Sequence, residues 1–173
     1  TFFAARARSQ FSRSLKEACQ GFTLIELLVA IGIMGILFVF GLNSYRDFAR
    51  REQLSEAVKM FKSELLLAQQ KALAGEKPVS GTCTSGALNG YEVNFRGNPY
   101  SVTADCGSRG GTNDPVVKTV SFPSGVSRYS GPDSVFFKVL AQGTEFSTNQ
   151  AIVFTQSVTN SKVTLTVTPS GSI

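Results

Sequence analysis

The strongest constraint on this chain is an apolar run from Phe22 to Tyr45 in which Glu26 is the one charged residue. A helix that is apolar on all sides has to lie in a membrane or inside a helical bundle, and this run is long enough to cross a bilayer. An ionised carboxylate at the centre of a span costs roughly 2.5–3.5 kcal/mol, and less near its end. Glu26 therefore either reaches the headgroups or has a cationic partner.

A basic leader, residues 1–21, precedes the run and ends in Gly21. Its four Lys/Arg and one Glu give +3 of the whole-chain +5, so the other residues carry only +2. A removable secretory signal has its small-residue cleavage site after the apolar region, and no such site follows this run. We expect cleavage after Gly21, which retains the apolar helix. The new amino group of Phe22 would then be a cation for Glu26 of a neighbouring subunit, because an unpaired buried charge is strongly penalised.

The helical pattern continues to Ala74 as an amphipathic segment. Its apolar stripe steps by three and four residues and comprises Leu54, Val58, Phe61, Leu65, Ala68 and Ala72. Gly75 and Pro78 supply the stop signal. Short segments rich in β-branched and aromatic residues then follow at 91–95, 100–104, 116–122, 134–140, 151–158 and 162–168. The first two and the last two are expected to form hairpins.

The predicted fold class is α+β: a long N-terminal helix, membrane-spanning in its first half and amphipathic in its second, followed by an antiparallel β-sheet head. The expected domains are a cleaved basic leader (1–21), the transmembrane and assembly half of the helix (22–45), the half packed on the head (46–77) and the β-rich head (78–173).

Composition argues against most catalytic chemistry. The chain has no His, which excludes the Ser–His, Cys–His and His-ligand metal arrangements. The acids of the second half are widely spaced, so we expect no metal site, no cofactor and no catalytic residue. Cys83 and Cys106 lie in a polar, weakly charged region, which favours a disulfide in an oxidising compartment; two buried free thiols are the alternative.

Residues 16–29, KEACQGFTLIELLV, resemble the class III signal of type IV prepilins and type II secretion pseudopilins. The resemblance implies that a prepilin peptidase cuts between Gly21 and Phe22 and N-methylates Phe22, and that Glu26 neutralises a neighbour's N-terminus during assembly. It implies a single pass of the bacterial inner membrane by residues 22–45 with the head outside the cytoplasm, then a periplasmic or cell-surface filament. The implied partners are other pilin or pseudopilin subunits, the peptidase and the filament assembly platform.

The head is similar to those of H-type pseudopilins and FimT-like minor pilins in residues 119–126, 135–144 and 163–173. The predicted function is therefore that of a structural minor pilin or pseudopilin, not an enzyme. One alternative is a DNA-binding minor pilin for transformation; its candidate contacts are Arg96, Arg109, Arg128, Lys138 and Lys162. Nucleic acid is a weakly supported partner, because most of the net charge lies in the leader. A second alternative is a membrane-anchored hydrolase whose distant carboxylates meet in the fold.

Overall fold

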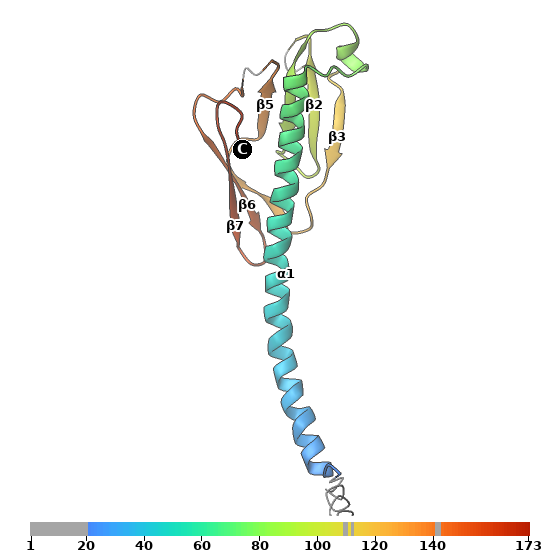
Figure 1. The fold of residues 1–173 in the computed structure, drawn as a ribbon, viewed down its shortest axis with the longest axis vertical. Coiled ribbons are helices and arrows are strands. Elements are labelled where there is room, and N and C mark those ends of the chain that lie inside the picture. Colours follow the sequence, from blue (N-terminus) through green and yellow to red (C-terminus); the bar gives the residue numbers. More distant parts are fainter. Residues whose placement is uncertain (1–20, 109–110, 112, 141–142) are drawn as a thin grey trace, which may run out of the picture. The chain divides into compact units, whose positions relative to one another are not determined.

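The computed structural model describes residues 21–108, 111, 113–140 and 143–173. The first twenty residues of the predicted leader and Arg109 lie outside the described residues. The chain divides between Asn43 and Ser44 into two compact units, which are considered separately below. Within the described residues, one long helix is followed by a short 3-10 turn and seven strands (Figure 1), which confirms the predicted α+β fold.

The helix α1 runs from Leu24 to Ala74. Its residues in the first unit are exposed on every side, and by length and composition α1 is apolar enough to cross a membrane. The helix ends in a Schellman motif: the N–H of Glu76 donates to the carbonyl of Lys71 (3.0 Å) and that of Gly75 to Ala72 (3.2 Å). Gly75 has a φ of +62°, a left-handed conformation that favours glycine. The stop predicted at Gly75 is therefore confirmed.

The strands of the second unit form two antiparallel sheets rather than the single sheet expected. The first has the order β3-β2-β1-β5, with β1 at Leu88–Asn94, β2 at Tyr100–Cys106, β3 at Val116–Val120 and β5 at Ser134–Lys138. The second has the order β4-β6-β7, with β4 at Val126–Ser130, β6 at Gln150–Gln156 and β7 at Lys162–Val167. Both predicted hairpins, β1–β2 and β6–β7, are present. β4 was not predicted, because its sequence VSRYS is short and mostly polar.

The second half of α1 packs on both sheets through its predicted stripe, all six residues of which are buried. In the view of Figure 1, β2 and β3 lie on one side of this helix segment and β6 and β7 on the other. Phe61 is at the centre of the core. Its ring centroid lies 5.3 Å from that of Tyr100 in β2 of the first sheet and 5.0 Å from that of Phe154 in β6 of the second. It also lies 4.9 Å from the ring centroid of Phe95, the residue directly after β1.

Two further interactions tie the first sheet to its surroundings. A disulfide joins Cys83, in the 3-10 helix η1 (Gly81–Thr84), to Cys106 at the end of β2, with 5.0 Å between the Cα atoms. Lys118 Nζ of the edge strand β3 donates to Glu64 Oε1 of α1 at 2.6 Å. Glu64 is buried, and its other oxygen, Oε2, has no hydrogen-bond partner. The charge of this carboxylate is therefore compensated mainly by Lys118.

Tyr100 lies beside this ion pair. Burial, with a smaller contribution from the negative charge of Glu64, raises the pKa of Tyr100 to about 12. Burial and the charge of Glu76 also raise the pKa of Tyr91, whose hydroxyl donates to the carbonyl of Glu76 at 2.5 Å. In both cases the protein interior favours the neutral phenol.

We predict that Lys118→Met lowers the free energy of unfolding by roughly 1–3 kcal/mol, because it leaves the Glu64 carboxylate buried without its partner. The double variant Glu64→Leu/Lys118→Met should recover most of the loss. Urea unfolding of the full chain in detergent measures both, with Lys77→Met as a control at an exposed lysine. Equal destabilisation by the single and double variants would show that the charge imbalance is not the cause.

We also predict that stability falls between pH 10 and pH 12. The unfolded chain ionises Tyr100 near pH 10 while the folded chain keeps it neutral up to about pH 12, so the stabilising contribution is complete below pH 10 and is lost as the pH rises through 12. The loss assigned to Tyr100 should be of the order of 2 kcal/mol. Tyr100→Phe should flatten this part of the pH profile, and an unchanged profile would contradict the assignment.

Candidate processing and assembly segment

The residues around the predicted cleavage bond are exposed and not helical. Gly21 and Phe22 precede α1, and Phe22 is 80% exposed. Among the described residues, apart from its chain neighbours, no heavy atom lies within 4 Å of the position that a Cβ on Gly21 would occupy. The Gly21–Phe22 peptide bond is therefore in an open backbone segment, which is the geometry that a peptidase requires of its substrate.

Thr23 caps the start of α1. Its Oγ1 accepts a hydrogen bond from the backbone N–H of Glu26 at 3.3 Å, and its carbonyl accepts from the N–H of Leu27 at 3.2 Å. The cap satisfies one of the backbone donors that every helix start leaves free. It was not predicted from the sequence, although Thr23-Leu24-Ile25-Glu26 is the S/T-x-x-E pattern of a capping box.

Glu26 lies in the first turn of α1 and is exposed. Its carboxylate forms no ion pair with any residue that the structure describes. A carboxylate is stabilised near the positive end of a helix dipole. Among the described residues, this weak interaction is the favourable electrostatic interaction that the Glu26 carboxylate has. The side chain is therefore accessible to a cation from outside this chain.

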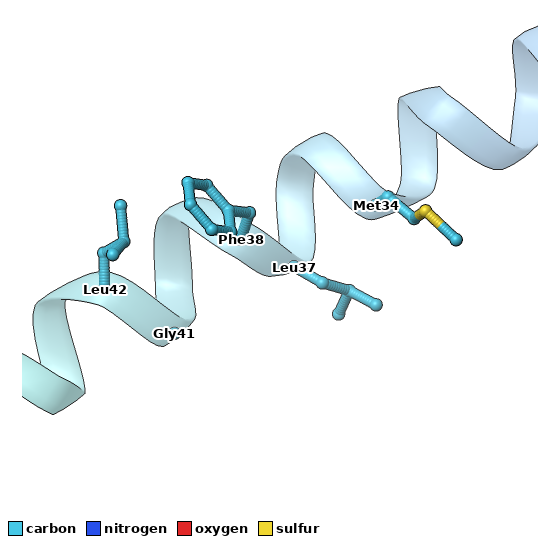
Figure 2. Close-up of a pocket in the computed structure, with 5 residues that line it drawn as sticks. All are labelled: Met34, Leu37, Phe38, Gly41 and Leu42. Atoms are coloured by element: carbon cyan, nitrogen blue, oxygen red, sulfur yellow. The ribbon is translucent and has the colours of Figure 1, made fainter.

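Residues 27–42 of α1, which follow Glu26, carry no ionisable or hydrogen-bonding side chain. Figure 2 shows an open hollow in the first unit lined by Met34, Leu37, Phe38, Gly41 and Leu42. The side chains of Phe38 and Leu42 point to one side of the helix, and Gly41 contributes no side chain between them. Because the lining is apolar, the hollow suits acyl chains or the side chains of another helix.

The basic residues predicted for a DNA contact are largely occupied within the head. Asp133 forms ion pairs with Arg96, at 3.9 Å, and with Arg128. Lys162 Nζ lies 3.5 Å from the centre of the Tyr129 ring, a cation–π contact. Lys138 is half-buried. Among the described candidates, the two arginines thus share the Asp133 carboxylate, and Lys162 lies over an aromatic ring.

Acidic residues of the described part of the head have structural contacts. Within the part of the chain that the structure describes, no group of three or more His, Cys, Asp or Glu side chains is placed to hold a metal ion. Asp114 Oδ1 accepts from the Thr82 hydroxyl at 2.7 Å and from the Cys106 N–H at 3.2 Å, and Asn89 donates to Asp105 at 2.7 Å. Asp114 thus ties a loop to η1 and β2, and Asp105 links the paired strands β1 and β2.

Comparison with known proteins gives matches to part of the chain. Residues 18–42 match the family model of the prokaryotic N-terminal methylation motif. The chain is 48% identical over 46 residues to the fimbrial protein EcpC of Eikenella corrodens, which is 27% of this chain and 30% of EcpC. It is 32% identical over 74 residues to a type IV major fimbrial protein FimA of Dichelobacter nodosus, which is 43% of this chain and 46% of FimA.

A fimbrial protein of Pseudomonas aeruginosa is 36% identical over 79 residues, which is 46% of this chain and 50% of that protein. The chain thus spans half or less of the length of these curated relatives. No solved structure gives a significant match to the chain. The match with printed bounds, to the methylation motif, covers residues 18–42.

Proposed function

We propose that this chain, which belongs by its N-terminal segment to the type IV pilin and pseudopilin superfamily, is a structural minor pilin or pseudopilin of a type IV pilus or type II secretion filament. The observation that carries the proposal is the match of residues 18–42 to the methylation motif, together with an exposed Gly21–Phe22 bond in front of an apolar helix. The relatives named above are fimbrial proteins, and the role proposed here is likewise non-enzymatic.

The proposed mechanism is processing followed by assembly. A prepilin peptidase cuts after Gly21 and methylates Phe22, and residues 22–45 hold the processed chain in the inner membrane with its head outside the cytoplasm. The subunit leaves the bilayer when the apolar face of α1 packs against the helices of other subunits at the assembly platform. The exposure of this face throughout the first unit supports such a transfer, because an apolar helix is stable only in lipid or among helices.

Glu26 has a specific part in this mechanism. Its carboxylate would compensate the α-amino group of Phe22 on a neighbouring subunit and so set the axial register of the two helices. The free position of this carboxylate in the described structure supports the role. The Thr23 cap gives the helix a defined first turn from which the carboxylate projects.

Among pilin-like proteins, we assign the head to the group of H-type pseudopilins and FimT-like minor pilins. The support is the sequence similarity of residues 119–126, 135–144 and 163–173. The last of these ends in a turn in which the N–H of Gly171 donates to the carbonyl of Thr168 at 2.9 Å. The ion pairs of Asp133 weaken the alternative of a DNA-binding minor pilin, which would show duplex binding that falls steeply with salt.

The proposal is tested by the intact mass and N-terminal peptide of the protein from native membranes and sheared filaments. We expect a chain that begins at Phe22 and carries one methyl group on its α-amino nitrogen. The same strain without prepilin peptidase is the control and should retain the leader. Retention of residues 1–21 where the peptidase is active would contradict the proposal.

We predict that Glu26→Ala leaves cleavage intact but lowers recovery in filaments by at least about tenfold, because an unpaired N-terminal cation costs more than about 1.4 kcal/mol. Glu26→Gln, which keeps the shape without the charge, should behave like Glu26→Ala. Thr23→Ala removes the cap but keeps the charge, and should retain most incorporation. Immunoblots of sheared filaments against whole membranes give the measurement, and normal recovery of Glu26→Ala would exclude the proposed charge pairing.

A further inference from the structure

A short basic and aromatic segment of α1, residues 45–51, follows the apolar run directly and belongs to the second unit. Its charged residues are three arginines and one aspartate, a net charge of +2: Arg46, Asp47, Arg50 and Arg51. Arg46 and Arg51 are exposed, and Arg50 is half-buried. The segment thus concentrates arginine at the point where the uncharged part of the helix ends.

Contacts within the chain do not account for these arginines. Neither Arg46 nor Arg51 forms an ion pair with another residue that the structure describes. Arg50 is paired with Asp47 at 3.4 Å, with side chains that are 39% and 60% exposed, and an exposed pair of this kind contributes little stability. The next acid, Glu52, lies roughly 100–160° from the three arginines around the helix. Positive charge is therefore available to a partner outside the chain.

The place of the segment in the chain corresponds to the boundary of a bilayer. Residues 27–45 carry no charge, and an apolar helix of about 20 residues crosses the hydrocarbon core. Arg46 therefore falls where the core ends. From Arg46 to Arg51 the helix rises about 7.5 Å at 1.5 Å per residue, and the headgroup layer on each side of the core is about 5–8 Å thick. All three arginines fit within the depth of one headgroup layer.

Two exposed aromatic residues support the same placement. Tyr45 and Phe48 are 69% and 65% exposed. Tyr45 comes directly before Arg46, and Phe48 lies between Arg46 and Arg50 in the chain. Tyrosine is enriched at the membrane–water interface, where its ring meets apolar chains and its hydroxyl meets polar groups. The aromatic rings and the guanidinium groups thus occupy one level of the helix, and that level suits an interface.

We propose that Arg46, Arg50 and Arg51 bind the phosphate groups of anionic phospholipids at the outer surface of the membrane. A guanidinium group can donate two parallel hydrogen bonds to one phosphate, which makes arginine well suited to this ligand. Anionic lipids also attract basic residues beside a span through the surface potential, by about fivefold in affinity for each residue. The methylene groups of the arginines can lie against apolar chains while their charges reach the phosphates.

The inference deepens the proposed function by naming the class of lipid that the anchored subunit prefers. It rests on that function for the membrane span and for the outward direction of the head. The leader carries four Lys/Arg, and cleavage after Gly21 removes them. Arg46, Arg50 and Arg51 are then the first basic side chains of the processed chain. They would hold the end of the span at one depth in the bilayer until the subunit enters a filament.

The test measures which lipids surround the segment in the full chain. The chain has no Trp, so Phe48→Trp introduces a single fluorescent reporter. The protein is inserted into mixed vesicles of phosphatidylcholine and phosphatidylglycerol in which one lipid or the other carries bromine, a quencher, on its acyl chains. The ratio of the two quenching efficiencies gives the local preference. We expect at least about a fivefold preference for phosphatidylglycerol at low salt, and a smaller preference at high salt because mobile ions screen the charges.

The variants are made in the same reporter background. Arg46→Gln/Arg50→Gln/Arg51→Gln should bring the ratio close to one. Lys59→Gln/Lys62→Gln is the matched control and should leave the ratio unchanged, because these lysines lie about 12 Å or more beyond Arg51 along α1. Flotation of the vesicles shows that each variant is inserted.

Two results would overturn the lipid contact. One is a ratio that is the same in the triple variant as in the reporter chain. The other is a preference that disappears when the protein is diluted in lipid, which would assign the arginines to contacts between copies of the chain.

The outcomes separate this inference from the proposed function. A chain that is processed at Phe22 and recovered in filaments but shows no lipid preference would keep the proposed function and lose this inference. Conversely, a chain that retains its leader in cells with an active prepilin peptidase but shows the preference would keep the lipid contact and lose the filament role.

Discussion

The packing of Phe61 and its neighbours against two separate sheets is the interaction on which the head depends. No strand of one sheet pairs with a strand of the other among the described residues, so hydrogen-bonded ladders do not join them. Rings from both sheets, those of Tyr100 and Phe154, instead contact Phe61 of α1. The helix is thus a structural part of the head, and removing its second half would leave two small sheets without a common core.

That dependence explains why α1 changes character along its length. Residues 54–72 need one apolar stripe, because one side of the helix meets the sheets and the other remains outside the core. The part of α1 that lies in the first unit is exposed and, apart from Glu26 in its first turn, apolar on every side. A single continuous helix can serve both purposes because its backbone satisfies its own hydrogen bonds in either environment. The absence of proline from α1 preserves that continuity.

Much of this organisation could be predicted from the sequence, for identifiable reasons. The stripe from Leu54 to Ala72, the stop at Gly75 and the two hairpins all follow from local periodicity and turn residues. The disulfide of Cys83 and Cys106, which the sequence favoured over free thiols, is present in the structure. The helical stripe, the stop and the hairpins depend on residues that are close in sequence. The disulfide was predictable because the head contains only two cysteines, so each has one possible partner there.

The features that were missed are those decided by distant residues. The short, polar β4 acquires strand structure by pairing with β6, which adds a third strand to the β6–β7 hairpin. The ion pair of Glu64 with Lys118 joins residues 54 positions apart, so no local pattern indicates it. Thr23 is a different case, since its capping pattern is local.

The edges of the two sheets carry features that discourage the addition of further strands. An open edge can pair with another chain unless charges, bulges or a covering segment prevent it. β3 has an irregular register against β2 and carries Lys118, and β4 has an irregular register against β6. β5 is covered in part by the bridge between Phe137 and Thr144. The fourth edge, β7, begins with the charged Lys162. Strand addition is thus discouraged at the described edges of both sheets.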